Sequence, residues 1–131
     1  MSDFANPLYW FDSADYDIQT AKAMFETKRY LYVGFMCHQT IEKALKGIFV
    51  SRHPDEELPY IHRLVRLANL AGVSSDMSDE QLTLLDTLNP LNIEARYPLH
   101  KEALLRSLTS QRCAELIKET EELLRWLKTK H

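Results

Sequence analysis

The residue types best suited to acid–base chemistry gather in one stretch of this chain that shows no clear helical periodicity. Between residues 89 and 108 the sequence holds Arg96, Tyr97 and His100. A histidine titrates near neutral pH and can move a proton, and an arginine is a fixed cation for charge that develops on phosphorus oxygens. A metal-independent attack of a ribose 2′-hydroxyl on its own phosphate needs both groups. We therefore treat Arg96 and His100 as candidate catalytic residues for RNA.

Two readings of this stretch stay open from the sequence. A loop of about twenty residues inside a compact domain is uncommon and is usually functional or mobile. On spacing alone, however, Arg-x-x-x-His is a pattern found by chance in many proteins. The alternative is an arginine tied to Glu42 or Glu94 beside an exposed histidine.

His38 and Glu42 form a second group, on a helix that we expect over residues 29–52. They are spaced i and i+4, so they share a helix face, and they interrupt an apolar stripe. A buried carboxylate is costly unless a cation pairs with it, and we expect Arg96 to be that cation. The Glu42–Arg96 pair would either orient Arg96 for catalysis or only hold residues 89–108 against the bundle. In the second case His38 would be an ordinary core histidine.

The sequence predicts no metal site and no cofactor. The spacing of His38 and Glu42 would suit two metal ligands, but the chain has no His-Glu-x-x-His and no Cys-x-x-Cys. Cys37 and Cys113 are the only cysteines, and both fall within apolar periodic patterns. This position is typical of reduced, buried thiols rather than of a disulfide.

Gln39, Lys43 and Lys46 lie on the more polar side of the same helix, where a solvated face is the default expectation. The alternative is a basic patch that binds a phosphodiester backbone, if the fold gathers further cations around these lysines. Those further cations are Arg52, Arg63, Arg66, Arg96 and Lys101.

Five helical segments are expected to position these residues. The first opens at Asn6-Pro7, with asparagine as the N-cap and proline in the first turn. The second, over residues 29–52, is apolar on most sides and is predicted to be the central helix of a bundle. The third is expected from near Pro59 to Gly72. The fourth begins at Ser78, with a capping box to Gln81, and ends at Asn89-Pro90. The fifth runs from about Thr109 to Lys128.

The bulk composition favours one helical domain over residues 1–131. Apolar residues make up 45% and charged residues 27%, a balance typical of globular proteins. No stretch is apolar enough for a membrane span and the N-terminus lacks the features of a signal peptide, so we expect a cytoplasmic protein without membrane contact. The net charge of −3 argues against a protein that coats nucleic acid non-specifically.

Several of these segments, taken in order, resemble the HEPN family in its small prokaryotic single-domain form. They are residues 38–46 (HQTIEKALK), 62–64 (HRL) and 94–98 (EARYP), together with an opening Trp10-Phe11-x-x-Ala14-x-x-Asp17 and Trp126 near the end. The resemblance implies an all-α, four- to five-helix up-and-down bundle, often a homodimer. It also implies a toxin encoded beside a nucleotidyltransferase antitoxin.

The resemblance further implies site residues. Active members are metal-independent endoribonucleases with an Arg-x(4–6)-His motif, which carries onto Arg96 and His100, with Glu42 orienting Arg96. Here only three residues separate the two, and Pro98 is among them, so we expect a degenerate motif. The predicted RNA- or nucleotide-binding residues are Tyr97, Lys43, Lys46, His38 and His62. The alternative is a non-catalytic module that binds a nucleotide or a protein partner.

Overall fold

The computed structural model describes residues 3–92 and 98–131, and the side chains of residues 98–100 lie outside this description. The described residues form six α-helices and three short 3-10 turns and contain no strand. The helices are α1 (Pro7–Glu26), α2 (Tyr30–Arg52), α3 (Leu64–Ala71), α4 (Asp79–Leu88), α5 (Pro98–Ser107) and α6 (Ser110–Lys128). The 3-10 turns are η1 (Asp3–Ala5), η2 (Ser74–Asp76) and η3 (Asn89–Leu91).

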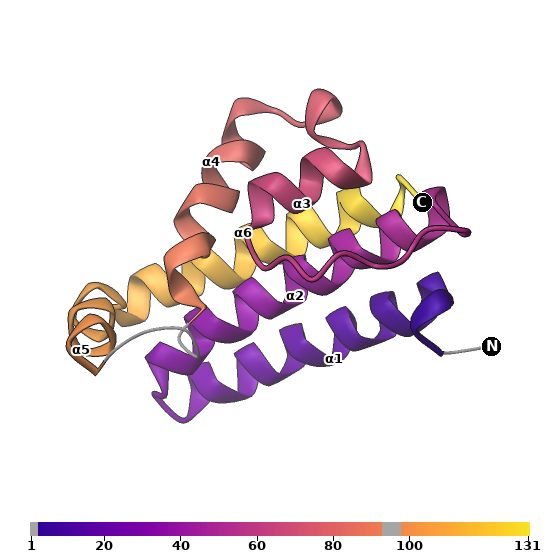
Figure 1. The fold of residues 1–131 in the computed structure, drawn as a ribbon. Coiled ribbons are helices and arrows are strands. Elements are labelled where there is room, and N and C mark those ends of the chain that lie inside the picture. The colour runs from indigo at the N-terminus through magenta and orange to yellow at the C-terminus, as the bar shows by residue number, and fades with distance from the viewer. Residues whose placement is uncertain (1–2, 93–97) are drawn as a thin grey trace.

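Helix α2 is the centre of the bundle and contacts each of the other five helices. Figure 1 shows α1 and α6 running along α2, α1 antiparallel to it and α6 parallel, with both chain ends at the same end of the bundle. One apolar stripe of α2 is fully buried, as a central helix requires: Val33, Cys37, Ile41, Ala44 and Ile48. None of the described helices is long and apolar enough to cross a membrane.

Helices α1 and α2 pack closely because a glycine lies between them. A β-carbon on Gly47 would come within 2.9 Å of the buried ring of Phe11, closer than such contacts occur. The start of α1 is as predicted, since the Asn6 side chain accepts a hydrogen bond from the backbone N–H of Leu8 and Pro7 is the first helical residue.

Helix α3 begins at Leu64, five residues later than the start expected at Pro59. Residues 57–63 form no helix and run alongside α2 instead (Figure 1). Tertiary contacts explain the late start: the Asn89 side-chain oxygen accepts a hydrogen bond from the Leu64 N–H at 2.9 Å. The predicted end is confirmed, because Gly72 caps the helix in the left-handed conformation, with φ 80°.

The stretch expected to be a loop over residues 89–108 contains η3 and the ten-residue helix α5, so that prediction was wrong in part. Pro98 is the first residue of α5, a position where its missing N–H has no helical partner to lose. Leu91 and Leu108, near the two ends of this stretch, both pack against Gly34 of α2. They lie 3.2 and 3.3 Å from where a β-carbon on Gly34 would be. The predicted capping box of Ser78 and Gln81 is confirmed at the start of α4.

Candidate functional site

Glu42 carries a carboxylate into the middle of the bundle, where it is only 4% exposed. One of its oxygens lies 2.8 Å from Nδ1 of His62, and the other lies 3.4 Å from Nζ of Lys46. Lys46 follows Glu42 by one helical turn and so shares its face, whereas His62 comes from the extended segment before α3. The carboxylate is therefore paired on both oxygens, which offsets the cost of burying it.

His62 is half-exposed, although its partner is buried: its side chain is 44% exposed. Because Nδ1 donates to the carboxylate, the neutral imidazole is held in the tautomer that leaves Nε2 as the acceptor. The ring of Tyr60 lies edge-on at 5.0 Å between centroids and is almost entirely exposed. An imidazole fixed in this way can take a proton at Nε2 while the carboxylate stabilises the resulting cation.

The expected pair of Glu42 and Arg96 stays a prediction. Arg96 and Tyr97 lie outside the described residues, as does the side chain of His100. Glu42 does have a cationic partner, but in the described structure it is Lys46, and the His62 imidazole pairs with the other carboxylate oxygen. His62 and Lys46 both belong to the segments that resemble the family, and Lys46 follows Glu42 by four residues on the same helix. The sequence indicated that Glu42 needs a partner, but only the fold identifies which residue is that partner.

His38 is fully buried one turn before Glu42. Its Nδ1 lies 3.3 Å from the Gln39 side-chain amide, and its Nε2 has no hydrogen-bond partner of good geometry among the described residues. Burial lowers the pKa of His38 because desolvation disfavours the imidazolium, although the Glu42 charge and the His62 backbone act in the opposite direction. This environment favours the core-histidine interpretation over the binding role expected from the sequence.

The expectation of a solvated face was wrong for Lys46, which is buried, whereas Gln39 and Lys43 are half-buried. Lys43 forms a 2.6 Å ion pair with the buried carboxylate of Asp17 on α1. Lys46 is 9% exposed and lies 5.6 Å from the ring centre of Trp10, also on α1. These lysines fasten α1 to α2 in the described structure, and RNA binding by either of them stays a prediction.

Arg52, another cation that the sequence suggested for a basic patch, instead makes hydrogen bonds within the fold. Its guanidinium donates to the carbonyl oxygens of Gly72 and Lys130, each at 2.8 Å, and so ties the ends of α3 and α6 to α2. Arg63 and Arg66 are exposed, and Arg63 directly follows His62. Arg63 is therefore an exposed cation next to His62 in the sequence, and Lys101 on α5 is half-buried.

A family model described as HEPN domain matches residues 8–130 of the chain. The chain belongs to the HEPN family. The crystal structure of TT1696 from Thermus thermophilus is similar to this HEPN domain, with a TM-score of 0.79 and 20% sequence identity over 95% of this chain and 98% of that one. A likeness at this identity shows the fold, and the expected all-α, HEPN-like bundle is confirmed. A search of curated proteins found no significant match.

The paired side chains of this HEPN domain connect the segments on which the resemblance rests. The Asp17–Lys43 pair joins the opening segment to residues 38–46, and the Glu42–His62 pair joins residues 38–46 to residues 62–64. Of these two contacts, only the Glu42–His62 pair includes a ring that is nearly half open to solvent. It is the part of this network best placed for chemistry.

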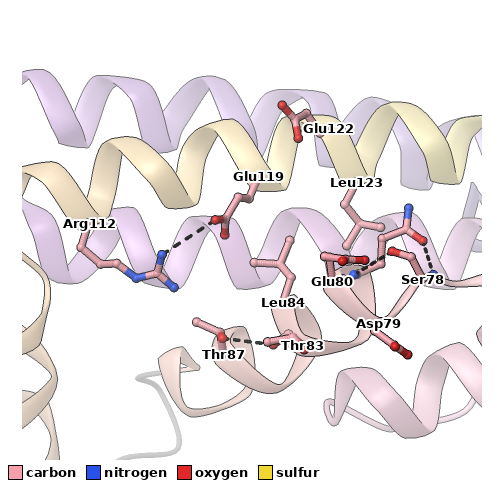
Figure 2. Close-up of a pocket in the computed structure, with 11 residues that line it drawn as sticks. Ser78, Asp79, Glu80, Thr83, Leu84, Thr87, Arg112, Glu119, Glu122 and Leu123 are labelled. Carbon is pink, nitrogen blue, oxygen red and sulfur yellow. Dashed lines mark hydrogen bonds and ion pairs between the residues drawn. The ribbon is translucent and has the colours of Figure 1, made fainter.

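Two clefts of about 590 Å³ each open on the described surface of the HEPN domain. Figure 2 shows the first, between α4 and α6, with Arg112 at one end directed at Glu119, 3.9 Å away, and the other carboxylates toward the opposite end. Four acidic residues line it against this one arginine, which disfavours a phosphodiester backbone. They are Asp79, Glu80, Glu119 and Glu122.

The second cleft lies beside the candidate site, and Trp10, Lys46 and Tyr60 are among the residues that line it. Its volume falls within the range of small-ligand sites. Tyr60 lies against His62, so a ligand in this cleft would meet the Glu42–His62 pair at its edge.

The thiols of the HEPN domain are not part of this site. Cys37 and Cys113 are free and buried, as expected. Burial raises the pKa of Cys37 to about 12 and that of Cys113 to about 11, so both are protonated and unreactive at neutral pH. Among the side chains that the structure describes, no three His, Cys, Asp or Glu residues form a group that could hold a metal ion.

Proposed function

We propose that this HEPN domain is an RNA-directed toxin that cleaves RNA without a metal ion, with Arg96 and His100 as its catalytic motif. The observation that carries the proposal is the position of Pro98. It begins α5 rather than interrupting a helix, so His100 is the third residue of a regular helix and Arg96 precedes that helix by two positions. The short Arg-x-x-x-His spacing thus spans a helix start.

A helix start suits this chemistry because its free N–H groups and dipole favour an anion such as a phosphate. The first turn of α5 contains no acidic residue that would compete for this position. In the proposed reaction Arg96 stabilises the charge on the phosphorane oxygens and His100 transfers a proton. The attacking 2′-hydroxyl restricts the substrate to RNA.

The proposed reaction is tested by incubating pure protein with single-stranded RNA in EDTA. We expect cleavage by the wild type and a loss of about 10²- to 10⁴-fold in rate for Arg96→Ala and His100→Ala. Arg106→Ala is the matched control, because Arg106 lies in the last turn of α5, away from the proposed motif. Intact RNA with the wild type, or full activity in His100→Ala, would contradict the proposal.

The toxin proposal extends to two partners, a second copy of the chain and a nucleotidyltransferase antitoxin. A homodimer would bring two motifs to one RNA backbone, and exposed aromatics such as Tyr32, 49% exposed, are available for contact. We expect light scattering to give twice the chain mass of 15.3 kDa, and co-expression with a neighbouring nucleotidyltransferase to yield a complex that no longer cleaves RNA. A monomer that is fully active would contradict the dimer.

A non-catalytic, nucleotide-binding module is the second candidate, favoured by the cleft lined by Trp10, Lys46 and Tyr60. In this case calorimetry would detect a nucleotide bound without turnover. Tyr60→Ala would weaken that binding, since an aromatic face lost from a stacked base costs about 1–3 kcal/mol. Arg96→Ala would then alter binding alone.

A further inference from the structure

We propose that the second cleft of the HEPN domain docks an extended segment of a partner protein, in which a large apolar side chain stands between basic ones. The docked segment pairs with the backbone of residues 57–61 and adds to it as a second strand. This inference goes beyond the proposed function and does not depend on RNA cleavage. It follows from a free backbone, an apolar cleft beside it, a buried amine and an acidic edge.

The backbone of residues 57–61 is open to pairing. These residues form no helix, and the segment runs extended alongside α2 (Figure 1). Among the described residues, none accepts a hydrogen bond from a backbone N–H of residues 57–61. Alternate N–H groups of an extended segment point to the same side, so those of Leu58 and Tyr60 form one row, whereas Pro59 leaves a gap in the opposite row. A row of free backbone groups is a template on which another chain can pair as a strand.

The second cleft offers space for a large apolar side chain directly beside this segment. Residues 56–60 all line it, and its volume is about 590 Å³. Trp10 from α1 and Val50 from α2 also line it, and both are buried. Successive side chains of a strand point to opposite faces, so one apolar side chain of a docked segment can enter the cleft while its neighbours point elsewhere. In strand addition such a pocket supplies specificity, and the main-chain hydrogen bonds supply affinity.

Lys46 gives the second cleft a buried hydrogen-bond donor. Its side chain lines the cleft, although the residue is only 9% exposed. An ammonium group has three N–H donors, and among the described residues Glu42 is its one hydrogen-bond acceptor, at 3.4 Å. Buried donors without an acceptor cost free energy, so a backbone carbonyl from a docked segment would stabilise this position.

The exposed edge of the second cleft is acidic. Glu56 and Glu57 line it and are exposed, and Asp55 directly precedes them. Lys46 does not offset these charges, because its ammonium is paired with Glu42. Opposite charge steers association and selects among partners, so the carboxylates favour a segment whose apolar residue is flanked by lysine or arginine. They disfavour a nucleotide, because they repel its phosphates.

The first test measures the binding of fluorescent, acetylated and amidated peptides to the full chain by fluorescence polarisation. The peptides have the pattern Lys-Thr-X-Thr-Lys or Glu-Thr-X-Thr-Glu, where X is alanine, valine, leucine, phenylalanine or tryptophan. We expect the lysine peptides with a large apolar X to bind about tenfold or more tightly than the one with alanine, because the larger side chain buries more apolar surface. If no lysine peptide binds, or if the glutamate peptides bind equally well, the proposal is overturned.

The second test asks whether the bound peptide pairs as a strand. Amide hydrogen exchange, followed by NMR at saturating peptide, should slow by about tenfold or more at Leu58 and Tyr60, because their N–H groups then donate to peptide carbonyls. Ile61 belongs to the opposite row and should exchange as it does in the free protein. Unchanged exchange at Leu58 and Tyr60 with the peptide bound would overturn the strand pairing.

The matched variants for the acidic edge are Glu57→Gln and Asp55→Asn. Each removes one exposed carboxylate from the same segment, but Asp55 is not among the residues that line the cleft. Glu57 is chosen over Glu56 because Glu56 already lies 3.4 Å from Nδ1 of His53. We expect Glu57→Gln to weaken the tightest lysine peptide severalfold and Asp55→Asn to leave its binding unchanged. An equal loss in the two variants would reveal unspecific attraction and overturn the role of the cleft.

Two further outcomes separate this proposal from the other functions. Binding of AMP to a protein that binds none of the peptides would assign the second cleft to a nucleotide and overturn the proposal. Peptide binding by a protein that cleaves no RNA would support the docking site and contradict the proposed function alone, because the docking site shares no residue with the Arg96 and His100 motif.

Discussion

At the scale of single residues, the fold gives its most consequential environment to Glu42. A carboxylate that is 4% exposed has to be paired, and here a lysine and a histidine share it. Lys46 holds one oxygen from within the bundle, and His62 holds the other at the surface. This division keeps the charge compensated even if the imidazole loses or gains a proton. Glu42 thus joins α2 to the segment before α3 through a partly exposed ring.

The contribution of the Glu42–His62 contact to stability can be measured directly. His62→Ala removes a hydrogen bond to a buried charged group, but Lys46 stays in place and water reaches the half-exposed position. We therefore expect a loss of about 1–2 kcal/mol in the free energy of unfolding, at the low end for a bond to a charged group. Urea denaturation measures it. A loss beyond about 4 kcal/mol would mean that the contact is chiefly a structural fastener.

His38 makes the stability of the protein sensitive to acid. Burial lowers its pKa in the folded state below the ordinary value of 6.5, so the unfolded chain binds the proton more readily. Its contribution to stability is therefore full above about pH 6.5 and falls as the pH drops through that value toward the folded pKa. Urea denaturation between pH 7.5 and pH 5 should show this fall, and His38→Gln should reduce it. An identical pH dependence in the two proteins would contradict the account.

At the scale of elements, local signals determine where most helices begin and end. Asn6 and Pro7, Gly72, and Ser78 with Gln81 all act as the sequence predicted, because capping depends on residues within one or two turns. The late start of α3 and the presence of α5 were missed. The first depends on Asn89 and Glu42, which are distant in sequence. In the second, Pro98 was read as a helix breaker when it is a helix start.

The contact of α1 with α2 offers a test of element packing at Gly47. Alanine has a higher helix propensity than glycine by about 1 kcal/mol, which would favour the variant if the site had room. The added β-carbon would lie 2.9 Å from the buried Phe11 ring, so the ring or the helix has to move. We expect Gly47→Ala to lower the melting temperature by several degrees, since overpacking costs about 1–3 kcal/mol. A variant more stable than the wild type would show that α1 is free to shift.

At the scale of the whole molecule, the HEPN bundle arranges its charged side chains as connectors. Lys43, Lys46 and Arg52 each join α2 to another segment, to Asp17 and Trp10 on α1 and to the ends of α3 and α6. Periodicity predicted the fold class and the central helix, because these follow from the distribution of apolar residues along the chain. It could not predict which cation meets which carboxylate, because such pairs join residues far apart in the sequence and depend on how the helices pack.

The most direct measurement of the central claim is the chemistry of the RNA ends produced by the pure protein in EDTA. Mass spectrometry of a short single-stranded RNA of known sequence should show fragments that carry a 2′,3′-cyclic phosphate and fragments that begin with a 5′-hydroxyl, absent with His100→Ala. Fragments with a 3′-hydroxyl and a 5′-phosphate, or no fragments at all, would contradict an attack by the 2′-hydroxyl and with it the proposed site.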